Sequence, residues 1–269
     1  KEYKTATMSV NALNGVDLDI SNNGLVSILG PSGCGKTTLL NIIGGLDSNF
    51  EGEVIINEKN IKKMNSHERD IYRNQEIGFV FQEYNLISTL NIYSNIELAL
   101  ALSKASTREK KKKIYELAQK LGIEKLLKKY PNELSGGQKQ RAVIARALIN
   151  NPKILLADEP TGALDSKTSI QILSILKEIS KSKLVIMVTH NKELALKYSD
   201  RIVNLQDGQI INDEIRYLNE DIIQEFTIKK SHNPFKNLFK MSLNNLLKKW
   251  LRTLLIIIAC SIGIIALCI

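Results

Sequence analysis

The chain has 269 residues, of which 43% are hydrophobic and 24% are charged, and its formal net charge is +9. These fractions are those of a folded protein, and the length allows one large domain and little more. Three scattered cysteines give no indication of a disulfide framework and fit a reduced, cytosolic setting for the ATPase. We find no internal repeat of 20–50 residues and expect no secretory signal peptide at the N-terminus.

The first element expected in chain order is a buried strand, Leu25–Leu29, which is a short apolar run. The stretch GPSGCGKTT, Gly30–Thr38, follows at once, and after it TLLNIIGGL predicts a helix that ends at Gly44–Gly45. Strand, glycine-rich loop and helix in this order are the setting of a G-x-x-x-x-G-K-[ST] phosphate loop. We call Gly30–Thr38 the phosphate loop.

The phosphate loop predicts a nucleotide site. Glycines let the backbone turn its N–H groups toward one anion, and the helix N-terminus adds partial positive charge. We expect Lys36 to reach the β- and γ-phosphates and the Thr37 hydroxyl to bind Mg²⁺. Cys34 fills a variable position of the motif, and we interpret it as an inert small residue rather than a redox switch. The alternative to a nucleotide site is that the whole loop is an ordinary glycine-rich turn. The residues expected to contact the nucleotide are Gly30, Pro31, Ser32, Gly33, Cys34, Gly35, Lys36, Thr37 and Thr38.

The rest of the chain up to about residue 213 predicts an α/β domain with a mainly parallel sheet. Val54–Asn57, with its flanking turn residues, predicts an antiparallel β-subdomain, and Leu86–Leu148 reads almost wholly as helix. The lysine-rich run Arg108–Lys113 is interpreted as a solvated helix face rather than a nucleic-acid arm, because apolar residues resume at helical spacing after it. The further strands expected are Gly78–Phe81, Ile154–Ala157, Leu184–Val188 and Ile202–Leu205.

Two carboxylates follow the predicted strand Ile154–Ala157 directly. We expect Asp158 to complete the Mg²⁺ shell through water and Glu159 to polarise the attacking water, with a solvated turn as the alternative.

A second helix start, LSGGQKQR, provides another possible phosphate cap, with Ser135, Gly136 and Gly137 just ahead of the helix. One phosphate does not need two caps. The pattern alone therefore predicts a P-loop ATPase or GTPase with a second nucleotide-contacting surface.

With these motifs in this order, the chain resembles the ATP-binding cassette (ABC) ATPases over about Tyr3–Asp213. The resemblance implies a P-loop NTPase fold with an α-helical subdomain that carries LSGGQ and faces a transmembrane partner. It also implies two ATPase domains paired head to tail, with each ATP between the phosphate loop of one subunit and LSGGQ of the other. One chain holds one such domain, so the expected partner is a second copy.

The resemblance also implies roles for residues outside the phosphate loop. Tyr3 matches the aromatic residue that stacks on adenine, and Gln82 matches the glutamine that senses Mg²⁺ and the attacking water. His190 matches the switch histidine on the γ-phosphate, and Asp165 matches the D-loop aspartate. The LSGGQ residues expected on the partner's ATP are Ser135, Gly136, Gly137 and Gln138. The implied cofactors are ATP and Mg²⁺.

The character of the sequence changes after an ATPase domain at 1–220. Residues 221–250 predict a basic linker and an amphipathic helix on a membrane surface, and seven Lys/Arg against two Asp/Glu between Asp221 and Arg252 give +5. Leu251–Ile269 is almost uninterruptedly apolar and predicts a truncated first transmembrane helix, with basic residues marking the cytoplasmic side. A buried core helix and a tail anchor are the alternatives. Anionic lipid is the expected partner of the positive charge, and nucleic acid is not.

The tail, together with NIIGGLD and LADEPTGALD, resembles the ABC subgroup of macrolide exporters, lipoprotein-release transporters and antimicrobial-peptide-resistance transporters. That resemblance implies an exporter or extraction pump in the cell membrane, with its permease fused after the ATPase. The alternative is an ATPase that transmits force to an extracytoplasmic hydrolase or sensor, with a partner protein there, and moves no substrate. A soluble cassette ATPase acting on DNA or the ribosome is disfavoured, because neither a coiled-coil insertion nor a second cassette is present.

Overall fold

The computed structural model describes residues 1–4 and 9–216. Two compact units are distinguished, and the first, residues 1–100 and 105–230, contains all the helices and strands described below. The second comprises residues 101–104 and 231–269. The amphipathic helix and transmembrane helix expected at 221–250 and 251–269 lie outside the described residues. Among the helices that are described, none is long and apolar enough to cross a membrane.

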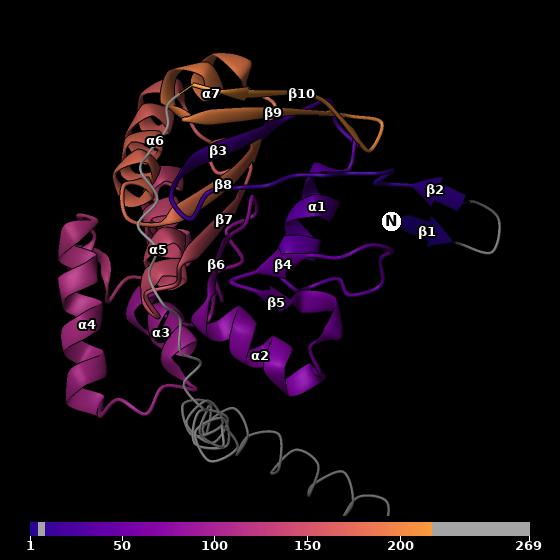
Figure 1. Ribbon diagram of the computed structural model, residues 1–269. Helices are drawn as coiled ribbons and strands as arrows, with labels where there is room; N and C mark the ends of the chain where they lie inside the picture. The colour runs from indigo at the N-terminus through magenta and orange to yellow at the C-terminus, as the bar shows by residue number, and fades with distance from the viewer. Residues whose placement is uncertain (5–8, 217–269) are drawn as a thin grey trace, which may run out of the picture. The chain divides into compact units, whose positions relative to one another are not determined.

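A six-stranded sheet with the strand order β10-β9-β3-β8-β7-β6 forms the centre of the first unit (Figure 1). Four of its five pairings are parallel, and only β10 pairs antiparallel, with β9. The mainly parallel sheet predicted from the sequence is therefore confirmed. Its strands are β3 Gly24–Leu29, β6 Ile77–Val80, β7 Ile154–Asp158, β8 Leu184–Thr189, β9 Arg201–Gln206 and β10 Gln209–Ile215.

Helices cover both faces of the sheet, which explains why β3 and β8 are buried along their whole length. One apolar cluster includes Leu25 and Leu155 and continues into α5 and α6, while the other includes Val26 and Leu156 and continues into α1. Figure 1 shows α1 and α5 on opposite sides of the strands. The helices nearest the sheet are α1 Lys36–Ile43, α2 Ser66–Gln75, α5 Gly136–Leu148, α6 Ser166–Ser180 and α7 Lys192–Tyr198.

The predicted helical region contains three α-helices and three short 3-10 turns. Ser106 caps α4 and pairs with Glu109 in a capping box, which fixes where that helix begins. Ile114 is buried on the inner face of α4, while Lys111–Lys113 are exposed, in agreement with a solvated lysine face. Besides α5, the elements here are α3 Ile92–Glu97, Leu98–Leu100, α4 Thr107–Lys120, Glu124–Leu126 and Pro131–Glu133.

The structure contains two separate antiparallel strand pairs, whereas the sequence predicted one antiparallel subdomain, around Val54–Asn57. Strands β1 Glu2–Lys4 and β2 Ser9–Asn11 form one pair, and β4 Ile55–Ile56 and β5 Lys59–Asn60 form the other. Strand β10 was not predicted from the sequence. Its residues, QIINDEI, are mostly exposed because the strand lies at the sheet edge, so neither an apolar run nor strict alternation marks it.

Candidate active site

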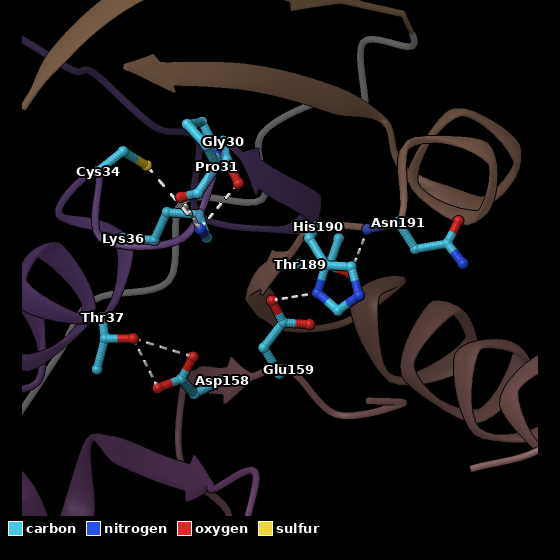
Figure 2. A network of polar contacts seen from close by, with 10 residues as sticks. All are labelled: Gly30, Pro31, Cys34, Lys36, Thr37, Asp158, Glu159, Thr189, His190 and Asn191. Atoms are coloured by element: carbon cyan, nitrogen blue, oxygen red, sulfur yellow. Dashed lines mark hydrogen bonds and ion pairs between the residues drawn. The ribbon is translucent and has the colours of Figure 1, made fainter. Parts of the chain in front are cut away.

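The candidate site lies at the carboxyl ends of the three adjacent parallel strands β3, β8 and β7 (Figure 2). The phosphate loop leaves β3, Asp158 and Glu159 leave β7, and His190 leaves β8. Side chains at this edge of a parallel sheet face a common crevice, which is where open α/β folds bind ligands. The fold therefore brings together residues that are up to 154 positions apart, from Lys36 to His190.

The phosphate loop needs its glycines for backbone conformation and for close approach. Gly33 and Gly35 have φ of 80° and 101°, in the left-handed region that side chains rarely adopt. A Cβ on Gly35 would also lie 2.1 Å from the carbonyl oxygen of Ala12, and one on Gly30 would lie 2.1 Å from that of Leu205. At Gly30 and Gly35 there is thus room for backbone but not for a side chain, which suits a nest of N–H groups around an anion.

Lys36 is folded back over this loop. Its ammonium donates hydrogen bonds to the carbonyl oxygens of Gly30, at 2.8 Å, and Pro31, at 2.7 Å. The Cys34 sulfur is 3.9 Å from the same nitrogen and is buried. Lys36 as a whole is only 8% exposed, so its charge lies inside the loop. An anion bound there would meet this charge together with the N-terminus of α1.

Thr37 and Asp158 form the second polar contact of the site. The Thr37 hydroxyl donates to Asp158 Oδ2 at 3.0 Å and lies 3.3 Å from Oδ1. Burial raises the pKa of Asp158, and the Thr37 hydrogen bond and the Lys36 charge oppose that rise. A hydroxyl and a carboxylate are hard oxygen ligands and fit Mg²⁺, which usually takes one or two protein ligands plus waters and phosphate oxygens. In the described part of the chain, no group of three or more His, Cys, Asp or Glu side chains is arranged so that it could hold a metal ion.

Glu159 and His190 form the third contact. Nδ1 of His190 lies 2.9 Å from Oε1 of Glu159, and the glutamate has a left-handed φ of 46°. Its backbone N–H donates to the carbonyl of Val188, which ties this turn to β8. The Glu159 side chain is 12% exposed and that of His190 is 70% exposed. Among the described residues, nothing hydrogen-bonds to the buried Oε2 of Glu159. The pairing with His190 thus orients the Glu159 carboxylate through Oε1.

Three further predicted residues make contacts separate from these three. Gln82 is exposed, and its amide nitrogen is 3.7 Å from the position of a Cβ on Gly162, in the turn that follows Glu159. Asp165 caps α6 by accepting from the N–H of Thr168 at 2.9 Å and from its hydroxyl at 2.6 Å, and these bonds lower the Asp165 pKa. The exposed Tyr3 hydroxyl donates to Asp47 at 3.2 Å.

The LSGGQ segment begins α5 differently from the prediction. Ser135 is the N-cap, but Gly136 and Gly137 are the first two helical residues and do not lie ahead of the helix. The reason is the capping box, in which Ser135 and Gln138 satisfy each other's backbone N–H groups. The side-chain hydrogen bonds described for Ser135 and Gln138 stay within this turn. We call Ser135–Gln138 the signature turn.

Thr168 is a residue that the sequence reasoning missed. A Cβ on Gly137 would lie 2.4 Å from its methyl group, so α6 and the signature turn are in contact there. The Asp165–Thr168 spacing, typical of a helix N-cap, was the available signal.

A phosphate loop between a strand and a helix, with paired carboxylates at the end of a neighbouring strand, defines a P-loop nucleotide-hydrolysing enzyme. The family model described as "ABC transporter" matches residues 13–162. The chain therefore belongs to the ABC transporter family, and its enzymatic activity is that of an ABC-type ATPase.

Relatives of this family cover most of the chain. The bacitracin export ATP-binding protein BceA of Halalkalibacterium halodurans is 41% identical over 212 residues, which are 78% of this chain and 83% of that protein. The macrolide export ATP-binding/permease protein MacB of Mannheimia succiniciproducens is 38% identical over 262 residues; the match includes 95% of this chain, which spans only 41% of MacB. A dimeric, post-hydrolysis structure of the ATP-binding cassette MJ0796, bound to ADP and Pi, superposes with a TM-score of 0.75. It is 42% identical and covers 81% of this chain and 97% of that one.

Proposed function

We propose that the protein hydrolyses MgATP at this site in order to drive an export-type membrane transporter. The observation that carries the proposal is the Glu159 carboxylate, which is 12% exposed and is oriented by Nδ1 of His190 at 2.9 Å, directly after the Thr37–Asp158 pair. A carboxylate in this state can accept a proton from water while it stays oriented.

In this proposal the phosphate loop binds the triphosphate, and Lys36 exchanges its carbonyl partners for the β- and γ-phosphates. Mg²⁺, held through Thr37 and Asp158, would neutralise charge on those phosphates. Glu159 orients the attacking water and His190 contacts the γ-phosphate end. Gln82, beside the turn after Glu159, reports on the same water. Catalysis is then mostly positioning and electrostatic stabilisation.

We further propose that two copies pair head to tail. The signature turn and Asp165 of one copy would contact ATP held by the phosphate loop of the other, and Tyr3 would stack on adenine. The dimeric structure of the MJ0796 cassette supports this arrangement. The exposed N-cap Ser135 supports it too, because the partial positive charge of a helix N-terminus is suited to an anion supplied by a partner.

A fused permease is the remaining part of the proposal. The MacB alignment omits only 5% of the 269 residues, about 13, so it extends well into the 53 residues of 217–269. Residues 251–269 would be the first membrane span, the basic stretch before it would lie against anionic lipid, and the ATPase would be on the cytoplasmic side. By analogy with the names MacB and BceA, the cargo class is an antimicrobial compound, with a lipopeptide as the other candidate.

The test is the ATPase rate of the full-length protein in lipid vesicles while a macrolide, bacitracin, a lipopeptide or a cationic peptide is added in turn. Stimulation by one class, absent in Glu159→Gln and retained in Glu193→Gln, supports transport or extraction. Glu193 is a suitable control because it is an exposed acid on α7 outside the site. A high rate that no cargo changes would refute the export proposal, and would favour force transmission to an extracytoplasmic protein.

A further inference from the structure

The segment between β6 and α3 carries Gln82 and contains a strained turn. Tyr84 and Asn85 have φ of 59° and 49°, and neither is a glycine. Residues with side chains adopt this left-handed region at a cost, so two in succession persist only where the surroundings hold them.

Arg146, from the C-terminal half of α5, supplies that support. Its guanidinium donates one hydrogen bond to the carbonyl of Tyr84, at 2.9 Å, and another to the carbonyl of Asn85. Burial lowers the pKa of Arg146, although an arginine remains charged. Two neighbouring carbonyls that accept from the two terminal nitrogens of one guanidinium use its planar fork, whereas a lysine ammonium would act as a single point charge.

The same turn also contacts the other end of α5. The Tyr84 hydroxyl is 3.1 Å from the position of a Cβ on Gly136, and the Lys139 ammonium is 5.9 Å from the centroid of the Tyr84 ring. Tyr84 is partly buried against the apolar cluster that contains α5. The turn is therefore attached to α5 at two places, one beside the signature turn and one at Arg146.

Asn95 of α3 holds the second half of the segment. Its side chain is fully buried, donates to the carbonyls of Ile87, Leu90 and Asn91, and accepts from the N–H of Ile87 at 2.8 Å. The residues after Tyr84 and Asn85 are thus fixed to the helical part of the domain as well. Gln82 lies two residues before Tyr84 and two residues after the end of β6, so it lies between this anchored stretch and the sheet.

We propose that Arg146 is a positioning residue for hydrolysis: by holding the Tyr84–Asn85 turn on α5, it fixes Gln82 relative to Glu159 and makes Gln82 move with the signature turn. The proposal rests on the role given to Gln82 under "Proposed function". It extends that role by assigning the link between the Gln82 segment and α5 to a specific side chain far from the nucleotide contacts.

Arg141 is a matched control on the same helix. It donates to the carbonyl of Leu121 and to the side chain of Gln171, and its described hydrogen bonds do not involve the Gln82 segment. Arg141→Ala therefore removes an arginine with two hydrogen bonds from α5 but leaves the Tyr84–Asn85 turn attached.

The experiment compares Arg146→Ala, Arg146→Lys and Arg141→Ala in the full-length protein. We expect kcat for ATP hydrolysis to fall about tenfold or more in Arg146→Ala, to fall less in Arg146→Lys, and to change less than about twofold in Arg141→Ala, with ATP affinity preserved in all three. Amide hydrogen exchange should accelerate over residues 84–87 in both Arg146 variants and not in Arg141→Ala. Arg146→Lys keeps the test informative if the alanine variant does not fold.

Gln82→Ala, tested alone and combined with an Arg146 variant, distinguishes the positioning role of Arg146 from the role of Gln82 in hydrolysis. If Arg146 acts through Gln82, the second substitution lowers kcat little further once Gln82 is absent. A low kcat in Gln82→Ala with normal kcat and exchange in both Arg146 variants would overturn the Arg146 inference alone. A normal kcat in Gln82→Ala would overturn the role of Gln82 and, with it, the positioning role of Arg146.

Discussion

The contact between Gly137 and Thr168 allows a stability prediction to be worked out in detail. A Cβ added at Gly137 would lie 2.4 Å from the Thr168 methyl, whereas its next neighbours are at 3.7 and 3.8 Å. The methyl must therefore retreat by about 1 Å to reach ordinary van der Waals contact. It cannot do so freely, because the Thr168 hydroxyl is held by Asp165 at 2.6 Å and its N–H by the same carboxylate at 2.9 Å.

We expect Gly137→Ala to lower the free energy of unfolding by about 1–3 kcal/mol, the usual cost of overpacking, even though alanine is the better helix former. Thr168→Ser removes the obstructing methyl but keeps the hydroxyl for Asp165, and alone should cost at most about 1 kcal/mol. The double variant should then be about as stable as Thr168→Ser, which corresponds to a coupling energy of about 1–3 kcal/mol.

Urea unfolding followed by circular dichroism measures this double-mutant cycle. Gly136→Ala with and without Thr168→Ser is the control, because a Cβ on Gly136 meets Leu164 and the Tyr84 hydroxyl instead of Thr168. Additive effects of Gly137→Ala and Thr168→Ser would refute the steric reasoning and the close contact between α6 and the signature turn.

Three further predictions concern charge. Lys36→Ala removes the ammonium from the phosphate loop and should abolish detectable ATP binding in a fluorescent-nucleotide titration; normal affinity would contradict the reading of the loop. Asp165→Ala removes the α6 cap and should cost about 1 kcal/mol in urea unfolding, whereas Asp165→Asn should cost less. Burial raises the pKa of Glu76 from 4.5 to about 7, so the unfolded carboxyl ionises above about pH 4.5 while the folded one keeps its proton until about pH 7. Stability should therefore fall by about 1–2 kcal/mol, after solvent screening, between about pH 4.5 and 7, and Glu76→Gln should remove this dependence; an unchanged pH profile would show that Glu76 is not the cause.

Much of the fold and of the site could be predicted from the sequence because the signals are local. An apolar run that leads into GPSGCGKTT specifies β3, the phosphate loop and α1, and the run before Asp158 specifies β7. Once these strands are parallel neighbours of β8, the sheet itself brings Asp158, Glu159 and His190 together.

What could not be predicted depends on contacts between distant residues. The attachment of Tyr84 and Asn85 to Arg146 joins positions about 60 apart, and no spacing rule connects them. Gly137 reads as one more flexible glycine, yet the Thr168 methyl is what excludes a side chain there. Strand β10 was missed because an edge strand with exposed polar residues has no apolar pattern.

Phosphate release from ATP by the Glu159→Gln protein, beside wild type and Glu193→Gln, tests the catalytic proposal most directly. If Glu159 is the general base, Glu159→Gln binds ATP with wild-type affinity but releases phosphate at least about 100-fold more slowly, and Glu193→Gln matches wild type. Phosphate release by Glu159→Gln at the wild-type rate would contradict that role and would require another group to activate the water.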